Sequence, residues 1–266
     1  MPSVHRALGS VCSPLMQQAT SFVRKLAAQL GIEITPFNSR GSDRAQLARF
    51  LGSRKVNLIF DVGANVGEYG RELRTLGYRG RIVSFEPLPA AHERLAKAAS
   101  RDAHWTVAPR TAIGSEEGLI SITNSAFSSV LRTAELRTRM HANCAIAHEE
   151  QVPLVTLDSV APMHMCRSDV AFLKIDVQGF EYEVLHGADR LLGQLCGVQL
   201  DVSLVPLYQG EKSFRFMLDF MECKGFDLHS LASVFMADTT GREIQLDAIF
   251  VRRGGPASRA EPPSRS

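Results

Sequence analysis

The chain has 266 residues and a mass of 29.2 kDa, a size that fits one α/β domain with appendages. With 45% hydrophobic and 22% charged residues, its composition is that of a globular protein, which excludes disorder of the whole chain. The net charge is +2, but the segment from Arg252 to the end holds four arginines and one acid, so the remainder has 26 basic and 27 acidic residues. A body this close to neutral lacks the basic surface of a nucleic-acid-binding protein, and nucleic acid is not expected as a partner.

The cysteines are odd in number, far apart and without a Cys-x-x-Cys pair: Cys12, Cys144, Cys166, Cys196 and Cys223. This pattern argues against a disulfide framework or a structural zinc site and favours a reducing compartment. No apolar run approaches the roughly 18 residues that a transmembrane helix needs, and no secretory signal is expected at the N-terminus. We therefore expect a soluble, cytoplasmic protein.

Residues 1–55 are expected to form an N-terminal helical extension. Apolar residues at helical spacing predict a helix over 14–30 with one apolar face. We expect that face to pack against its own domain, and it also offers a surface for homo-oligomer formation, whereas its few basic residues do not suit a membrane-surface helix. A turn-rich linker over 35–43 and a short helix near 43–51 follow.

From residue 56 to residue 253, strands and helices alternate, which predicts a doubly wound, mostly parallel α/β sheet with helices on both faces. A hairpin-like stretch over 112–123 and a polar segment over 124–150 interrupt the alternation, and residues 254–266, rich in proline, are expected to be a disordered tail. Strands are predicted over 56–61, 81–85, 104–107, 152–157, 170–176, 196–203, 226–231 and 246–252, and helices over 66–76, 88–99, 180–193 and 211–224.

A glycine-containing loop, DVGANVG from Asp61 to Gly67, follows the first strand and precedes a helix. In open α/β sheets, ligands bind at the carboxyl ends of the strands, and Gly63 and Gly67 let a ligand approach the backbone. Asn65 stands where a dinucleotide-binding loop has glycine, and no Gly-Lys-Ser/Thr follows. The loop therefore favours a nucleoside ligand without a diphosphate.

The second strand ends at Glu86, 25 residues after Asp61. An acid at that strand end can accept hydrogen bonds from both ribose hydroxyls of an adenosine, whereas its simplest alternative role is a favourable interaction with a helix dipole. The glycine-containing loop, the 25-residue spacing and the acid at Glu86 together favour adenosine binding.

A second motif, FLKIDVQGFE, contains an apolar strand that ends at Asp176. In a doubly wound sheet this strand lies beside the first, so the carboxylate would face the same crevice, as a general base for a hydroxyl or as a ligand of a divalent cation. The alternative is that Asp176 caps the next helix or pairs with Lys174. Glu181, in the first turn of that helix, is predicted to interact with the helix dipole.

In this order, several segments resemble the FkbM family of S-adenosylmethionine-dependent methyltransferases: DVGANVGEYG, VSFEP, FLKIDVQGFEYEVLHGA, VQLDVSLVPLYQG and QLDAIFVRR. The resemblance extends from about Asn57 to Arg253. It implies a class I methyltransferase (Rossmann-like) fold whose last strand, over 245–252, is antiparallel, and it implies O-methylation, commonly of sugar or polyketide hydroxyls. It also implies that Asp61, Gly63, Asn65 and Gly67 surround the methionine part of the cofactor and that Glu86 holds the ribose.

Three positions depart from the family pattern. Arg110 stands where the segment after the third strand has asparagine, the serine-rich motif near 124–131 lacks one serine, and Asp201 stands where glutamate is common at the end of the fifth strand. Related sugar O-methyltransferases place Mg²⁺ near equivalent strand ends, so Asp176 and Asp201 are candidates both for catalysis and for metal ligation. We favour a metal-independent base at Asp176, because only two acidic ligands are identifiable and a hydroxyl acceptor needs a proton acceptor.

The sequence thus predicts an O-methyltransferase that acts on a hydroxyl of a small molecule, such as the sugar of a glycolipid or another glycosylated natural product. The alternatives are an NAD-dependent oxidoreductase, which Asn65 disfavours, and a non-catalytic cofactor-binding module, which the pair Asp176 and Asp201 disfavours. Residues 124–150 and the N-terminal extension are expected to shape the acceptor pocket.

Overall fold

A computed structural model describes residues 43–124, 148–208, 210–236 and 241–254. The chain divides into two compact units, residues 1–46 and 47–266, and only the first residues of α2 (Asp43–Ser53) are described in the first unit. The predicted helix over 14–30, most of the linker, most of the polar segment and the tail from 255 onward lie outside the described residues. The described elements therefore belong almost entirely to the second unit.

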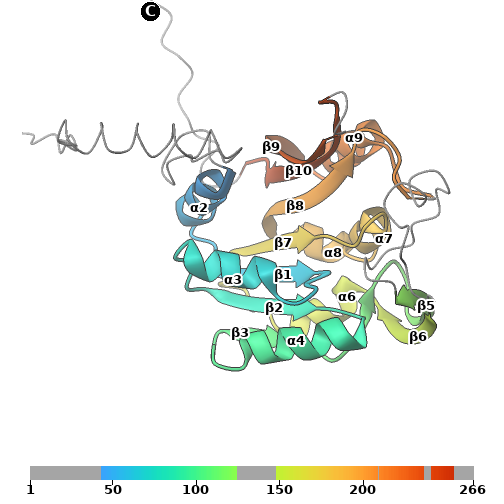
Figure 1. Cartoon of the computed structure of the whole chain (residues 1–266). Helices are drawn as coiled ribbons and strands as arrows, with labels where there is room; N and C mark the ends of the chain where they lie inside the picture. The colour runs from blue at the N-terminus through green and yellow to red at the C-terminus, as the bar shows by residue number, and fades with distance from the viewer. Residues whose placement is uncertain (1–42, 125–147, 209, 237–240, 255–266) are drawn as a thin grey trace, which may run out of the picture. The chain divides into compact units, whose positions relative to one another are not determined.

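A seven-stranded sheet with the order β3-β2-β1-β7-β8-β10-β9 forms the centre of this unit. From β1 the chain builds outward through β2 and β3, and from β7 it builds in the other direction (Figure 1). The first five strands of this order are parallel, and β10 is antiparallel to both neighbours, which confirms the predicted class I methyltransferase architecture. The strands are β1 (Leu58–Val62), β2 (Arg81–Phe85), β3 (Trp105–Val107), β7 (Ala171–Ile175), β8 (Leu195–Ser203), β9 (Phe226–Met236) and β10 (Glu243–Arg252).

Helices cover the sheet on both faces, so the central strands β1 and β7 are buried at every position. On one face, Ile59 and Phe172 pack with α2, α3 (Glu68–Thr75) and α4 (Pro89–Ala99). On the other face, Phe60 and Leu173 pack with four helices: α6 (Leu157–Val160), α7 (Glu181–His186), α8 (Asp189–Leu192) and α9 (Phe214–Cys223). A 3-10 turn, η1 (Ala161–Met163), follows α6. Strands buried on both faces explain the nearly continuous apolar runs of the sequence.

A second, three-stranded sheet consists of β4 (Ala112–Ile113), β6 (His148–Val155) and β5 (Gly118–Asn124), in that order. The predicted hairpin over 112–123 is wrong in its pairing, because β6 lies between the two strands, parallel to β4 and antiparallel to β5. The apolar residues Val152 and Leu154 of β6 pack with Ala112 and Ile120, and this burial, rather than the short turn, selects the order.

The predicted helix over 180–193 is divided into α7 and α8 at Gly187. A Cβ at position 187 would lie 1.9 Å from the carbonyl oxygen of Gly114, so the chain there packs directly against the segment that follows β4. In the part of the chain that the structure describes, no helix combines the length and apolar character needed to cross a membrane.

Candidate active site

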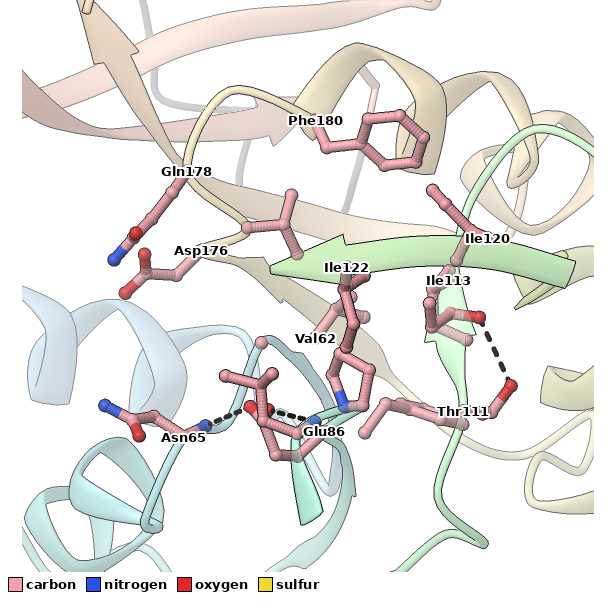
Figure 2. A pocket seen from close by; sticks show the side chains of 16 residues that line it. Val62, Asn65, Glu86, Thr111, Ile113, Ile120, Ile122, Asp176, Gln178 and Phe180 are labelled. Carbon is pink, nitrogen blue, oxygen red and sulfur yellow. Dashed lines mark hydrogen bonds between the residues drawn. The ribbon is translucent and has the colours of Figure 1, made fainter. Parts of the chain in front are cut away.

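A pocket lies at the carboxyl ends of β1, β2 and β7, where the chain order of the large sheet reverses. Asn65, Asp176 and Gln178 lie toward one end of the pocket, and Glu86 lies between them and the apolar end (Figure 2). The apolar wall is made by Ile113, Ile120, Ile122 and Phe180, together with Val62, Phe85, Leu88 and Val177. The polar end can hold charged and hydroxyl groups, and the apolar end can hold a planar ring.

The loop after β1 turns sharply because three of its residues have left-handed backbone conformations: Gly63 with φ 79°, Asn65 with φ 48° and Gly67 with φ 83°. The N–H groups of Gly63 and of the next residue both donate to the carbonyl oxygen of Phe85, which fixes the loop to β2. A Cβ at position 63 would lie 1.9 Å from the carbonyl oxygen of Asp176. Glycine at this position therefore lets the loops after β1 and β7 touch.

Glu86 is 4% exposed and lies in the pocket wall. Its Oε2 accepts a hydrogen bond from the N–H of Asn65 and its Oε1 accepts one from the N–H of Leu88, each at 2.8 Å (Figure 2). Burial raises the pKa of this carboxyl, and the two N–H groups partly offset the rise. Each carboxylate oxygen has a second lone pair, so Glu86 can fix the loop and still accept hydrogen bonds from two hydroxyls.

Asp176 directly follows β7, and its N–H donates to the carbonyl oxygen of Val62 at 3.0 Å. Its side chain is 43% exposed in the pocket wall, while the side chain of its ion-pair partner Lys174 is buried, with 3.4 Å between Oδ2 and Nζ. A carboxylate placed in this way can accept a proton from a group bound in the pocket.

Gln178 also lines the pocket, although no sequence pattern marked it as a site residue. It is left-handed, with φ 55°, a conformation that costs free energy for a residue with a side chain. Glu181 stabilises this turn, because its carboxylate accepts hydrogen bonds from the N–H groups of Val177 and Gly179. The structure thus gives Glu181 a more specific task than the predicted interaction with the helix dipole, since it fixes the loop that carries Asp176.

Three predicted site residues do not line the pocket. Asp61 is 1% exposed, and its Oδ2 accepts a hydrogen bond from the hydroxyl of Ser84 at 2.9 Å. Gly67 begins α3. Asp201 lies on β8 and accepts a hydrogen bond at Oδ2 from the side chain of Gln245. The pocket therefore brings together Gly63, Asn65, Glu86 and Asp176, while Asp61, Gly67 and Asp201 are not part of its lining.

Arg110, at the position where the family pattern has asparagine, is ion-paired with Glu150, with 2.6 Å between Nη1 and Oε1. This pair ties the start of β4 to β6, and Arg110 does not line the pocket. The substituted position thus serves the small sheet rather than the pocket wall.

Three carboxyls near the pocket, two buried and one half-buried, hold their protons more tightly than they would in water. Burial raises the pKa of Asp61 to about 6, that of Glu181 to about 7 and that of Asp201 to about 8. The unfolded chain loses these protons near pH 4, so between about pH 4 and pH 8 these three groups bind more protons in the folded chain than in the unfolded chain. The free energy of unfolding therefore decreases as the pH rises through this window.

We accordingly expect the melting temperature to be lower at about pH 8.5 than at about pH 5.5, and Asp201→Asn to reduce that difference. Thermal unfolding monitored by fluorescence at both pH values measures this difference in melting temperature. Glu93→Gln, a substitution of an exposed acid on α4, is the control. A melting temperature that stays constant or rises between these pH values would contradict the assignment of protonated buried carboxyls.

Comparison with known proteins identifies the domain type. Residues 61–228 match the family described as the methyltransferase FkbM domain. No curated protein matches the chain. Among solved structures, LepI in complex with SAM has 12% identity and a TM-score of 0.43 over 91% of this chain and 53% of LepI, so the chain spans about half the length of that protein.

Two further structures are covered over nearly their whole length. A putative RNA methyltransferase, PH1948 from Pyrococcus horikoshii, has 12% identity and a TM-score of 0.43 over 86% of this chain and 97% of its own. An S-adenosylmethionine-dependent methyltransferase from Mesorhizobium loti has 11% identity and a TM-score of 0.43, over 80% of this chain and 99% of its own.

Proposed function

Because the chain belongs to the FkbM methyltransferase family, we propose that it transfers a methyl group from S-adenosylmethionine to a hydroxyl, such as that of a sugar in a glycolipid or another glycosylated natural product. One observation carries this proposal. The carboxylates of Glu86 and Asp176 line the same pocket, the first buried and the second 43% exposed. A buried acceptor for a ribose and an accessible acceptor for a proton are the two groups that this reaction requires.

The residues of the pocket fit the cofactor. Glu86 keeps a lone pair on each oxygen for the ribose hydroxyls, and the left-handed loop at Gly63 and Asn65 brings backbone rather than side chain to the pocket. The wall formed by Ile113 and Ile122 is suited to the adenine ring. We therefore assign Glu86 to the ribose and the loop after β1 to the methionine part.

The reaction is a displacement in which the acceptor oxygen forms a bond to the methyl carbon as the carbon–sulfur bond breaks and its electron pair remains on sulfur. S-adenosylmethionine, when bound, supplies the electrophilic methyl group. Asp176 accepts the hydroxyl proton, so the oxygen attacks without accumulating positive charge. The rigid attachment of Asp176 to β1, through the carbonyl oxygen of Val62, supports this role by fixing where the proton acceptor lies.

Binding of the demethylated product, S-adenosylhomocysteine, tests the cofactor assignment. At about 100 times its dissociation constant it is expected to stabilise the protein by about 2.7 kcal/mol, whereas NAD is not. Glu86→Ala is expected to weaken binding by about 1–3 kcal/mol, because the acceptor for the ribose is lost and the N–H groups of Asn65 and Leu88 lose their partner. Isothermal titration calorimetry measures this loss, with Glu93→Ala as the control.

Stabilisation by NAD alone would overturn the cofactor class, and unchanged affinity in Glu86→Ala would overturn the ribose assignment. The acceptor class is tested with S-adenosylmethionine labelled in its methyl group and a panel of methyl hexosides, methyl 6-deoxyhexosides and glycolipids. Label transferred to an alkali-stable ether supports O-methylation, and label found only in nitrogen or carbon products contradicts it.

A further inference from the structure

A buried ammonium group lies directly behind the pocket. Lys174 is 6% exposed on β7, its Nζ donates to the carbonyl oxygen of Ile175 at 3.3 Å, and it lies 3.4 Å from Oδ2 of Asp176. It also lies 5.7 Å from the centre of the Tyr69 ring. A lysine buried to this degree needs partners for its charge.

Its ion-pair partner is Asp176, and the neighbouring strands β1, β8 and β10 carry three further acids near it. Asp61 on β1 is the register neighbour of Lys174, and Asp201 on β8 is the register neighbour of Asp247 on β10. The ammonium of Lys174 therefore lies among acidic side chains and pairs directly with the one that faces the pocket.

The same arrangement does not fit a divalent cation at Asp176 and Asp201. Mg²⁺ needs oxygen ligands at about 2.1 Å in an octahedron, and with the ammonium of Lys174 in place no group of three or more His, Cys, Asp or Glu side chains among the described residues is arranged to hold a metal. The ammonium of Lys174 already lies at Oδ2 of Asp176 and would repel a second cation there.

We propose that Lys174 is a positioning residue that supplies the positive charge of this site in place of a divalent cation and fixes the carboxylate of Asp176 in the pocket wall. The role of Lys174 in the reaction rests on the function proposed above. That its ammonium occupies the position of a divalent cation beside Asp176 does not depend on that function. The ion pair through Oδ2 restricts the rotamer of Asp176, so the proton acceptor is ordered before an acceptor molecule binds.

Titration with Mn²⁺, a paramagnetic substitute for Mg²⁺, tests the proposal on the full chain without an acceptor. By electron paramagnetic resonance, the wild type is expected to bind no Mn²⁺ at Asp176 with a dissociation constant below about 1 mM. Lys174→Met removes the ammonium from among the carboxylates and is expected to gain a Mn²⁺ site, which the double variant Lys174→Met/Asp176→Asn loses. Lys97→Met, at an exposed lysine of α4, is the matched control and should behave as the wild type.

Two results would overturn the proposal: a wild-type Mn²⁺ site that Asp176→Asn removes, or a folded Lys174→Met that binds Mn²⁺ no better than the wild type. Lys174→Arg keeps the positive charge and is expected to exclude Mn²⁺, so a Mn²⁺ site in this variant also counts against the proposal, even where Lys174→Met does not fold. S-adenosylhomocysteine binding, measured on the same samples, separates the two proposals. If S-adenosylhomocysteine does not bind, the cofactor assignment is rejected, while the Mn²⁺ titration still tests whether Lys174 excludes a divalent cation.

With an acceptor from the panel, Lys174→Met is expected to lower kcat by about 10–100-fold, with the KM for S-adenosylmethionine near that of the wild type. Lys174→Arg should recover part of the loss. A general loss of packing would instead change both constants, and an equal loss in Lys174→Arg would contradict a role for the charge.

Discussion

Asp176→Asn is expected to reduce methyl transfer by about 10²–10⁴-fold while S-adenosylhomocysteine binds with nearly wild-type affinity. Asparagine keeps the size of the side chain but cannot accept the hydroxyl proton, and the cofactor contacts assigned to Glu86 and the loop after β1 are untouched. Single-turnover rates with a labelled methyl group, together with calorimetric binding of S-adenosylhomocysteine, measure the two effects separately.

Asp201→Asn is the matched comparison for Asp176→Asn, because Asp201 does not line the pocket and bonds to Gln245 instead. We expect its effect on turnover to be mild and EDTA to leave the rate unchanged. Comparable losses in both variants, with inhibition by EDTA, would support two metal-ligating aspartates. Full activity in Asp176→Asn would remove its catalytic role and leave it the simpler task of pairing with Lys174.

Gly63→Ala is expected to destabilise the fold by about 3 kcal/mol or more. The residue has φ 79°, and a Cβ there would lie 1.9 Å from the backbone oxygen of Asp176 and 2.8 Å from its carbonyl carbon. Backbone atoms cannot rotate away as a flexible side chain can, so the loops after β1 and β7 must separate. Equilibrium unfolding in urea measures the loss.

Gly77→Ala provides the control, because Gly77 has φ 88° but a Cβ at this position would have no neighbouring atom within 4 Å among the described residues. It carries the cost of a left-handed alanine, about 1–2 kcal/mol, without the steric contact. The difference between the two variants isolates the contact between the loops. Equal destabilisation would show that the loops do not touch in solution.

The large sheet could be predicted from the sequence because its strands are buried on both faces. Burial makes segments such as Leu58–Val62 and Ala171–Ile175 nearly continuous apolar runs, each interrupted by one charged residue, and the helices between them fix the parallel direction. The small sheet could not be predicted in the same way. The insertion of β6 between β4 and β5 joins residues about 40 positions apart, such as Ala112 and Leu154, and no local pattern records such a pairing.

The break between α7 and α8 has a similar cause. Gly187 ends the helix where it meets the carbonyl oxygen of Gly114, a contact over more than 70 residues. Intrinsic helix propensity favours a continuous helix over 180–193, and tertiary packing overrides it.

Within the site, the residues found from the sequence are those that immediately follow strands: Gly63 and Asn65 after β1, Glu86 after β2 and Asp176 after β7. The remaining wall was missed because Ile120 and Ile122 resemble any strand residues until the small sheet is placed. Gln178 lies next to Gly179 in a turn, and only its φ of 55° distinguishes it. For Lys174 the signal was present, since a lysine inside an apolar strand requires a buried partner.

The pocket is divided between two sheets, which carry its acidic groups and part of its apolar wall separately. Glu86 and Asp176 follow strands of the large sheet, whereas Ile113, Ile120 and Ile122 belong to the small sheet. Substitutions in the small sheet can therefore remodel the pocket while the ion pair of Asp176 and the hydrogen bonds of Glu86 persist. An engineer who wishes to alter how the cofactor is held without touching the proton acceptor should therefore begin with Ile113 and Ile122, the part of the wall assigned to the adenine ring.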